Sequence, residues 1–96
     1  MDYGQHIAAH VRITILRLLE SQPTYKLNSS LLCDGCDAMG LPVTRDGIAT
    51  QLAWLAEQGL VTLDDLGRLV IAKLTARGLD VAHGKARVPG VKPPSP

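Results

Sequence analysis

The feature that most constrains the fold is a pair of short β-prone runs that follows three helix-prone segments. The runs are Leu60–Leu63 and Leu69–Ala72, and the five residues between them include Gly67, as expected for the turn of a hairpin. A chain of 96 residues is limited to one hydrophobic core. The helices and the hairpin therefore belong to one domain.

Three segments before the hairpin and one after it have the signals of helices. The first spans Tyr3 to about Gln22, where apolar residues recur at three- and four-residue spacing before a proline. A short extended piece at Tyr25–Leu27 precedes a second helix over about Ser30–Met39. The third helix is capped by Thr44 and runs to about Gln58, and the last is capped by Thr75 and runs to about His83.

The composition is that of a soluble globular protein, with 46% apolar and 20% charged residues. Aromatic residues make up 3% and Phe is absent, so Leu, Ile, Val and Ala must build the core. Uncharged apolar stretches are far shorter than the roughly 20 residues of a membrane-spanning helix, and the first residues lack the pattern of a signal peptide. We expect a cytoplasmic protein that does not enter a membrane.

The order of these elements is that of a winged helix-turn-helix, a mainly α fold with a small β-hairpin. It takes up residues 1–84, which we expect to form the domain. Residues 85–96 contain four prolines, Gly90 and three cations, so a flexible basic tail is expected there.

Two local motifs resemble those of ArsR- and MarR-like bacterial regulators. Residues 44–61 end in the pattern Leu-x-x-Leu-x-x-x-Gly-Leu-Val, and residues 74–78 read Leu-Thr-x-x-Gly. Over nearly its whole length the chain also resembles a family of small proteins of Mu-like phages and prophages that is labelled ArsR-like by its fold. These resemblances imply a winged helix-turn-helix and a phage or prophage origin.

A winged helix-turn-helix binds double-stranded DNA by laying its second helix in the major groove, while other contacts hold the phosphates. Arg45 is suited to guanine and Gln51 to adenine, whereas Arg68 and the tail cations, among them Lys92, are suited to phosphate. We expect a homodimeric transcription regulator that pairs through its first and last helices. The expected DNA-binding residues lie on the third helix, the wing and the basic tail: Thr44, Arg45, Thr50, Gln51, Arg68, Lys85 and Arg87.

The distribution of charge leaves a second function open. Residues 1–67 carry four Lys or Arg against eight Asp or Glu, a net −4, whereas residues 68–96 carry six against one, a net +5. Asp64 and Asp65 occupy the wing tip, where carboxylates oppose phosphate. The alternative is a winged-helix module that binds a protein partner and little or no DNA, with Arg45 and Gln51 on a solvated helix face.

Cys33 and Cys36 form a Cys-x-x-Cys unit that can supply two thiolates to a metal ion. A structural zinc site needs four ligands, and the sequence has no second such pair. The plainer alternative is that Cys33 is a small core residue and Cys36 a free thiol. His6 and His10 lie four residues apart, on one face of the first helix.

The sequence lacks a phosphate-binding glycine loop, a nucleophile elbow and a His-Glu-x-x-His motif. We therefore expect neither an enzyme nor a cofactor.

Overall fold

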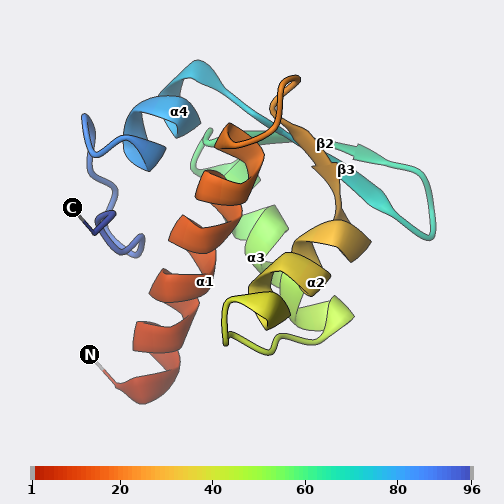
Figure 1. Ribbon diagram of the computed structural model, residues 1–96, viewed down its shortest axis with the longest axis horizontal. Coiled ribbons are helices and arrows are strands. Elements are labelled where there is room, and N and C mark those ends of the chain that lie inside the picture. The colour runs from red at the N-terminus through yellow and green to blue at the C-terminus, as the bar shows by residue number, and fades with distance from the viewer. Residues whose placement is uncertain (1, 96) are drawn as a thin grey trace.

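A computed structural model describes residues 2–95 and has the winged helix-turn-helix architecture that the sequence predicts (Figure 1). Three helices precede a two-stranded wing, and a short helix follows it. The elements are α1 (Tyr3–Glu20), β1 (Lys26–Asn28), α2 (Ser29–Ala38), α3 (Arg45–Glu57), β2 (Val61–Asp65), β3 (Val70–Leu74) and α4 (Ala76–Ala82).

Each helix begins at a side chain that caps its first turn. The capping residues are Asp2, Asn28, Thr44 and Thr75, and each side-chain oxygen accepts a hydrogen bond from the backbone N–H three residues later, at 2.8, 2.8, 2.9 and 3.0 Å. Such caps satisfy backbone donors that have no partner within the helix. The caps at Thr44 and Thr75 confirm the sequence prediction.

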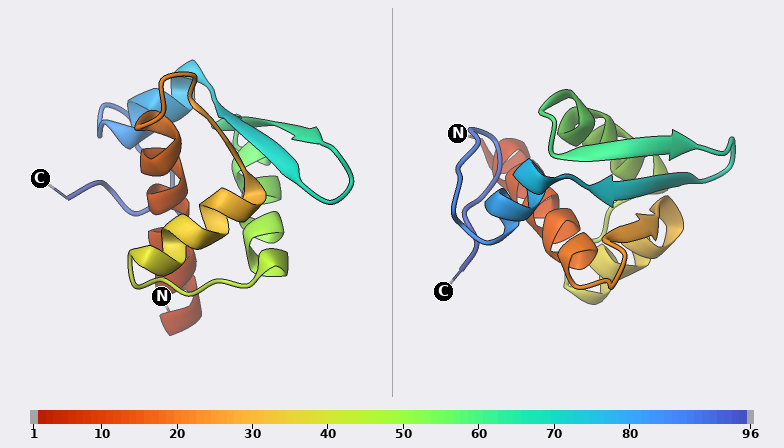
Figure 2. Two further views of the ribbon diagram at one scale, coloured as in Figure 1. Left: turned by 45° about the vertical axis from the view of Figure 1, so that its right-hand side comes forward. Right: turned by 90° about the horizontal axis from the view of Figure 1, so that it is seen from above.

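The wing belongs to a three-stranded antiparallel sheet with the strand order β1-β3-β2. The short extended piece expected after the first helix is β1, and it pairs with β3 so that Leu27 lies opposite Ala72. Seen from above, β2 and β3 extend to one side of the molecule, while α4 and both chain ends lie on the other (Figure 2). The wing thus projects away from the C-terminal segment.

The core surrounds α1 and is aliphatic, as the composition predicts. Ile15, Leu16 and Leu19 are fully buried, and they share the core with side chains of α2, α3 and the sheet. Gly35 allows α2 to approach α1 closely, because a Cβ atom at this position would lie 2.7 Å from Cδ1 of Leu18. A larger residue at position 35 would require the side chain of Leu18 to move, so the glycine that weakens the helix by propensity favours this close packing.

The segment after α4 differs from the flexible tail that the prolines suggested. Val88 and Val91 are buried, and the N–H of Val91 bonds to the carbonyl of Val88 across a turn that contains Gly90. The backbone N–H of Lys92 also donates to the carbonyl of Ala9 in α1, at 3.2 Å. The two valines face the core, so Pro89 and Gly90 shape a packed turn and the folded unit extends beyond residue 84.

Candidate nucleic-acid interface

The helix predicted to enter the major groove is α3, and its outward face is acidic. Ile48, Leu52 and Leu55 of this helix are buried in the core. The structure describes every residue of α3. After Arg45, the exposed residues of this helix include two carboxylates and no cation. These exposed residues are Asp46, Ala49, Thr50, Ala53 and Glu57.

Two serines at the start of α2 connect α3 with the wing. The guanidinium of Arg45 donates to the hydroxyl oxygen of Ser30 at 3.2 Å. The backbone N–H of Val70, the first residue of β3, donates to the hydroxyl oxygen of Ser29 at 3.1 Å. The beginnings of α2 and α3 and the loop end of the wing therefore meet, and we call Ser29, Ser30, Arg45 and Val70 the serine junction.

Sequence reasoning missed the role of the serines in this junction. The adjacent hydroxyls at the start of a predicted helix were the available signal, but their partners lie 15 and 41 residues further along the chain.

The wing combines acidic residues with two exposed cations, Arg68 in its loop and Lys73 in β3. Within β2 only Val61 is buried, and Asp64 and Asp65 are exposed. The Asp65 carboxylate accepts a hydrogen bond from the N–H of Gly67 at 2.8 Å and so shapes the turn. Arg68 is exposed and precedes Val70, a member of the serine junction, by two residues. Arg68 is thus close in sequence to the junction that holds Arg45.

Gln51 lies apart from the outward face of α3. Its side-chain oxygen accepts a hydrogen bond from Nε of Arg12 at 2.7 Å. The same guanidinium stacks 3.8 Å from the ring centre of Trp54 and donates to the carbonyl of Gly90 at 2.9 Å. This arrangement, the Arg12 clasp, comprises Arg12, Gln51, Trp54 and Gly90. The side-chain oxygen of Gln51, one of the two groups that would pair with adenine, is therefore already bonded to Arg12.

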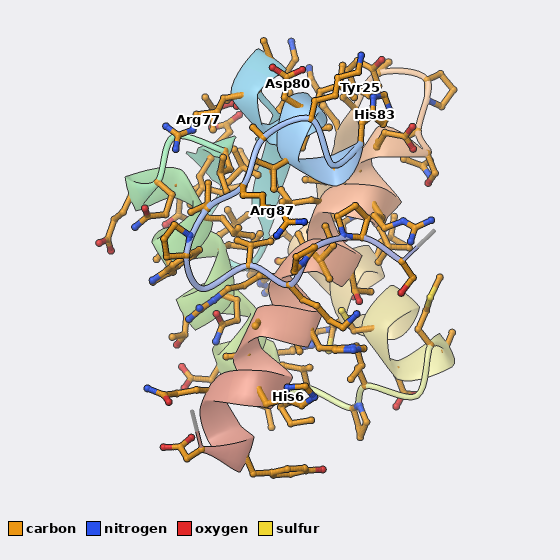
Figure 3. The ribbon with its side chains drawn as sticks, turned by 90° about the vertical axis from the view of Figure 1, so that its left-hand side faces the viewer. His6, Tyr25, Arg77, Asp80, His83 and Arg87 are labelled. Atoms are coloured by element: carbon orange, nitrogen blue, oxygen red, sulfur yellow. The ribbon has the colours of Figure 1, made fainter. Side chains whose placement is uncertain are left out.

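The predicted DNA-binding residues fall into three groups. Thr44, Arg45 and Thr50 lie in the first half of α3, and Arg68 lies on the wing. Gln51 belongs to the Arg12 clasp. Arg87 lies on the face of the molecule opposite the wing, beside the end of α4 (Figure 3), and Lys85 is two residues before it.

The structure assigns the two cysteines to different environments from those expected. Cys36 is fully buried in the core, whereas Cys33 is half-buried and its thiol donates to the carbonyl of Val43 at 3.0 Å. Burial, followed by the nearby Cys33, raises the pKa of the Cys36 thiol to about 11. The fully buried core cysteine is therefore Cys36, whereas Cys33, expected in the core, is partly buried and packs against it.

Residues 2–95 contain no group of three or more His, Cys, Asp or Glu side chains placed to hold one metal ion. His6 and His10 lie on one face of α1, as predicted, with their ring centres 5.7 Å apart. Burial, then the charges of Lys92 and His6, lowers the pKa of His10.

The chain has three helices followed by a wing, and the serine junction joins the second and third helices to that wing. These features define a winged-helix protein. Its sequence is 48% identical to gp26 of Escherichia phage Mu over 85 residues, which cover 88% of each chain. It is also 38% identical over 80 residues to a protein of Haemophilus influenzae, covering 82% of this chain and 78% of that one. The chain belongs to the family of phage Mu gp26.

Comparison with solved structures supports the fold. RosR from H. salinarum matches with a TM-score of 0.66 over 78% of this chain and 67% of its own, at 21% identity. A structure of RosR-S1 described as a complex matches with a TM-score of 0.64 over 77% and 65%, also at 21% identity. No protein-family model matches the chain. Among the described residues, no helix is both long and apolar enough to cross a membrane.

Proposed function

We propose that this protein is a DNA-binding transcription regulator of phage or prophage origin, related to the ArsR-like winged-helix regulators. The observation that carries the proposal is the serine junction. It joins the starts of α2 and α3 to the wing and leaves Arg45 exposed at that meeting point. Winged-helix proteins bind DNA with these elements, and the gp26 relationship supports the phage origin.

The proposed DNA contact is made by the first turns of α3 rather than by its full length. Asp46 lies in the first turn and Glu57 at the end of α3, so laying the whole helix along a groove brings both carboxylates toward phosphate, whereas a contact by the first turns brings Asp46 alone. At the start of the helix, Arg45 and Thr50 can reach bases, and backbone N–H groups carry partial positive charge. Thr44 contributes by holding the first turn in place.

Phosphate contacts in this proposal come from the cation of the wing loop, Arg68. Arg68 is exposed on the wing loop, and it can follow the backbone beside the groove that receives α3. Two cations per chain predict weak binding by one subunit. A homodimer bound to two half-sites about one DNA turn apart would double the number of contacts.

A salt series with a mixed-sequence duplex tests the proposal. Fluorescence anisotropy should give an affinity that falls with added sodium chloride, and each phosphate contact contributes about −0.9 to the logarithmic slope. Arg68→Ala should reduce the steepness of this slope by about 0.9 per chain. Arg77→Ala is the matched control, because Arg77 is an exposed arginine of α4 on the face opposite the wing.

Base recognition by Arg45 needs a separate measurement. Selection from a random duplex pool should yield a preferred sequence with the unmodified protein and a relaxed one with Arg45→Ala. An identical preference for both proteins would remove Arg45 from base recognition. The absence of binding near physiological salt would reject the whole proposal.

A second candidate function is a protein-interaction module. The observation that favours it is the exposure of two leucines on the acidic wing, Leu63 at 38% and Leu66 at 61%. Exposed apolar side chains beside carboxylates suit a partner segment with both apolar and basic residues. A protein captured from phage-producing cells by the unmodified chain and lost with Leu66→Asp would support this function. The absence of DNA binding by the unmodified chain would further support the protein-interaction function.

A further inference from the structure

The C-terminal segment folds back over the ends of α1 and α4 and borders an open hollow of about 380 Å³. Figure 3 shows this side of the molecule, with Arg87 next to the segment that crosses α1 and His83 beside the end of α4. Basic side chains come to the hollow from three elements: Arg17 from the last turn of α1, His83 from the end of α4, and Arg87 from the C-terminal segment. The hollow is thus built by parts of the chain far apart in sequence.

The two arginines of this hollow have no counter-ion among the described residues. Across residues 2–95, the one pair of opposite charges within 4.0 Å joins His83 to Glu20, at 2.9 Å. Neither Arg17 nor Arg87 donates a side-chain hydrogen bond to another described residue. The lining of the hollow includes no Asp or Glu. Arg17 and Arg87 therefore both line the hollow, and neither has a hydrogen-bond or ion-pair partner among the described residues.

The backbone around the hollow is held in a defined shape. Gly84 ends α4 with a φ of +78°, a conformation that side chains disfavour. A Cβ atom at Gly84 would lie 3.3 Å from Cγ of Pro94, so glycine also allows the C-terminal segment to approach. Pro93 and Pro94 have restricted backbones, and Ser95 adds a hydroxyl group to the lining. The arginines therefore face a shaped recess.

We propose that this hollow binds the phosphate group of a small phosphorylated ligand. Arginine presents a planar fork of donors that matches phosphate oxygens in pairs, and two such forks can satisfy one group. Ser95 supplies a further hydrogen-bonding group, and so does Nδ1 of His83, whose Nε2 is paired with Glu20. The site lies on the face opposite the wing, so it is separate from the proposed DNA contact and does not depend on it.

Titration with inorganic phosphate tests the site directly. In ¹H–¹⁵N NMR spectra at constant ionic strength, added phosphate should shift the amide signal of Gly84 and the Nε–H signals of Arg17 and Arg87, and the shifts should saturate. Arg87→Gln should weaken phosphate binding about tenfold, because it removes the charge and the donor fork. Arg77→Gln, which changes an exposed arginine outside the hollow, should leave the binding unchanged.

Several outcomes would overturn the proposal. These are shifts that do not saturate, shifts of the same size with chloride alone, and equal weakening by Arg77→Gln. Since Arg17 lies on α1, where its replacement could affect folding, Arg87→Gln with an unchanged melting temperature is the deciding variant.

A second arm distinguishes a small ligand from the backbone of DNA as the source of the phosphate. The affinity for duplex DNA is measured with Arg87→Gln beside the unmodified protein. Unchanged DNA affinity together with lost phosphate binding supports a small ligand. A parallel loss of both would assign the hollow to DNA phosphate and overturn the small-ligand proposal. Loss of base preference in Arg45→Ala is independent of either result.

Discussion

The guanidinium of Arg12 lies 3.8 Å from the ring centre of Trp54 and ties the C-terminal turn to α3. Its Nη1 donates to the carbonyl of Gly90, while its Nε donates to Gln51. Burial lowers the pKa of the Arg12 guanidinium, and no carboxylate among the described residues pairs with it. An aromatic ring and two neutral oxygens thus take the place of a counter-ion.

We expect Arg12→Ala to lower the free energy of unfolding by about 1–3 kcal/mol, because it removes a cation–π contact and two hydrogen bonds to charged donors. Urea denaturation followed by Trp54 fluorescence measures the change. Arg77→Ala, at an exposed position, should stay within about 0.5 kcal/mol of the unmodified protein. Equal effects of the two substitutions would contradict a stabilising role for the clasp.

Gly78→Ala should destabilise the fold by about 2–4 kcal/mol. A Cβ atom on this buried residue of α4 would collide with the carbonyl oxygen of Leu60 and would lie 2.8 Å from Cδ1 of Leu74. The measurement is again the free energy of unfolding in urea.

Gly4→Ala is the matched control for this prediction. Gly4 is exposed in α1, and its Cβ atom would have only Oδ1 of Asp2 nearby, at 3.5 Å. In that position alanine should stabilise the helix by about 0.5–1 kcal/mol. If Gly78→Ala lowers the free energy of unfolding and Gly4→Ala raises it, packing at Gly78, and not helix propensity, decides the effect of the substitution.

Cys36 should make the protein less stable as the pH rises from about 9 to about 11. The pKa of its thiol is raised from 9.0 to about 11 in the folded chain, so in this interval the unfolded chain loses the proton first. The unfolded state then binds fewer protons, and the free energy of unfolding falls with pH.

Because other groups also titrate in this interval, the informative quantity is the difference between the unmodified protein and Cys36→Ala. That difference should shrink with rising pH. A difference that stays constant across the interval would show that the thiol pKa is not raised by folding.

Thr44→Ala should cost about 1 kcal/mol through loss of the α3 cap. Thr44→Ser keeps a hydroxyl group that can accept the N–H of Gly47, so it should retain most of the stability. Chemical denaturation of both variants checks this directly. If DNA affinity falls with Thr44→Ala but not with Thr44→Ser, Thr44 acts by holding the first turn of α3. Equal stability of the alanine variant and the unmodified protein would rule out the cap.

The helices were predictable from sequence because their limits depend on neighbouring residues. Thr44 and Thr75 cap the helices that begin after them, and glycine follows closely where α3 ends. The pairing of β1 with β3 was not predictable, since it joins Leu27 to Ala72 across the length of the chain. The same holds for Gln51, whose partner Arg12 is 39 residues away.

Two errors in the sequence prediction have specific causes. The rotation of α2 about its axis is set by its packing on α1, which buries Leu32 and Cys36, four residues apart. That spacing was available in the sequence as a sign that Cys36 faces inward. The C-terminal prolines suggested flexibility, but Val88 and Val91, on either side of the turn, are apolar and are buried in the core.

The hydrogen bond between Lys92 and Ala9 joins the segment after α4 to the first helix. During translation, α1 leaves the ribosome early, but Val88 and Val91, which belong to the same core, follow about 70 residues later. The domain can therefore complete its core only after these two valines have left the ribosome. A ribosome that stalls shortly before residue 88 would release a chain with exposed apolar surface, a substrate for chaperones and proteases.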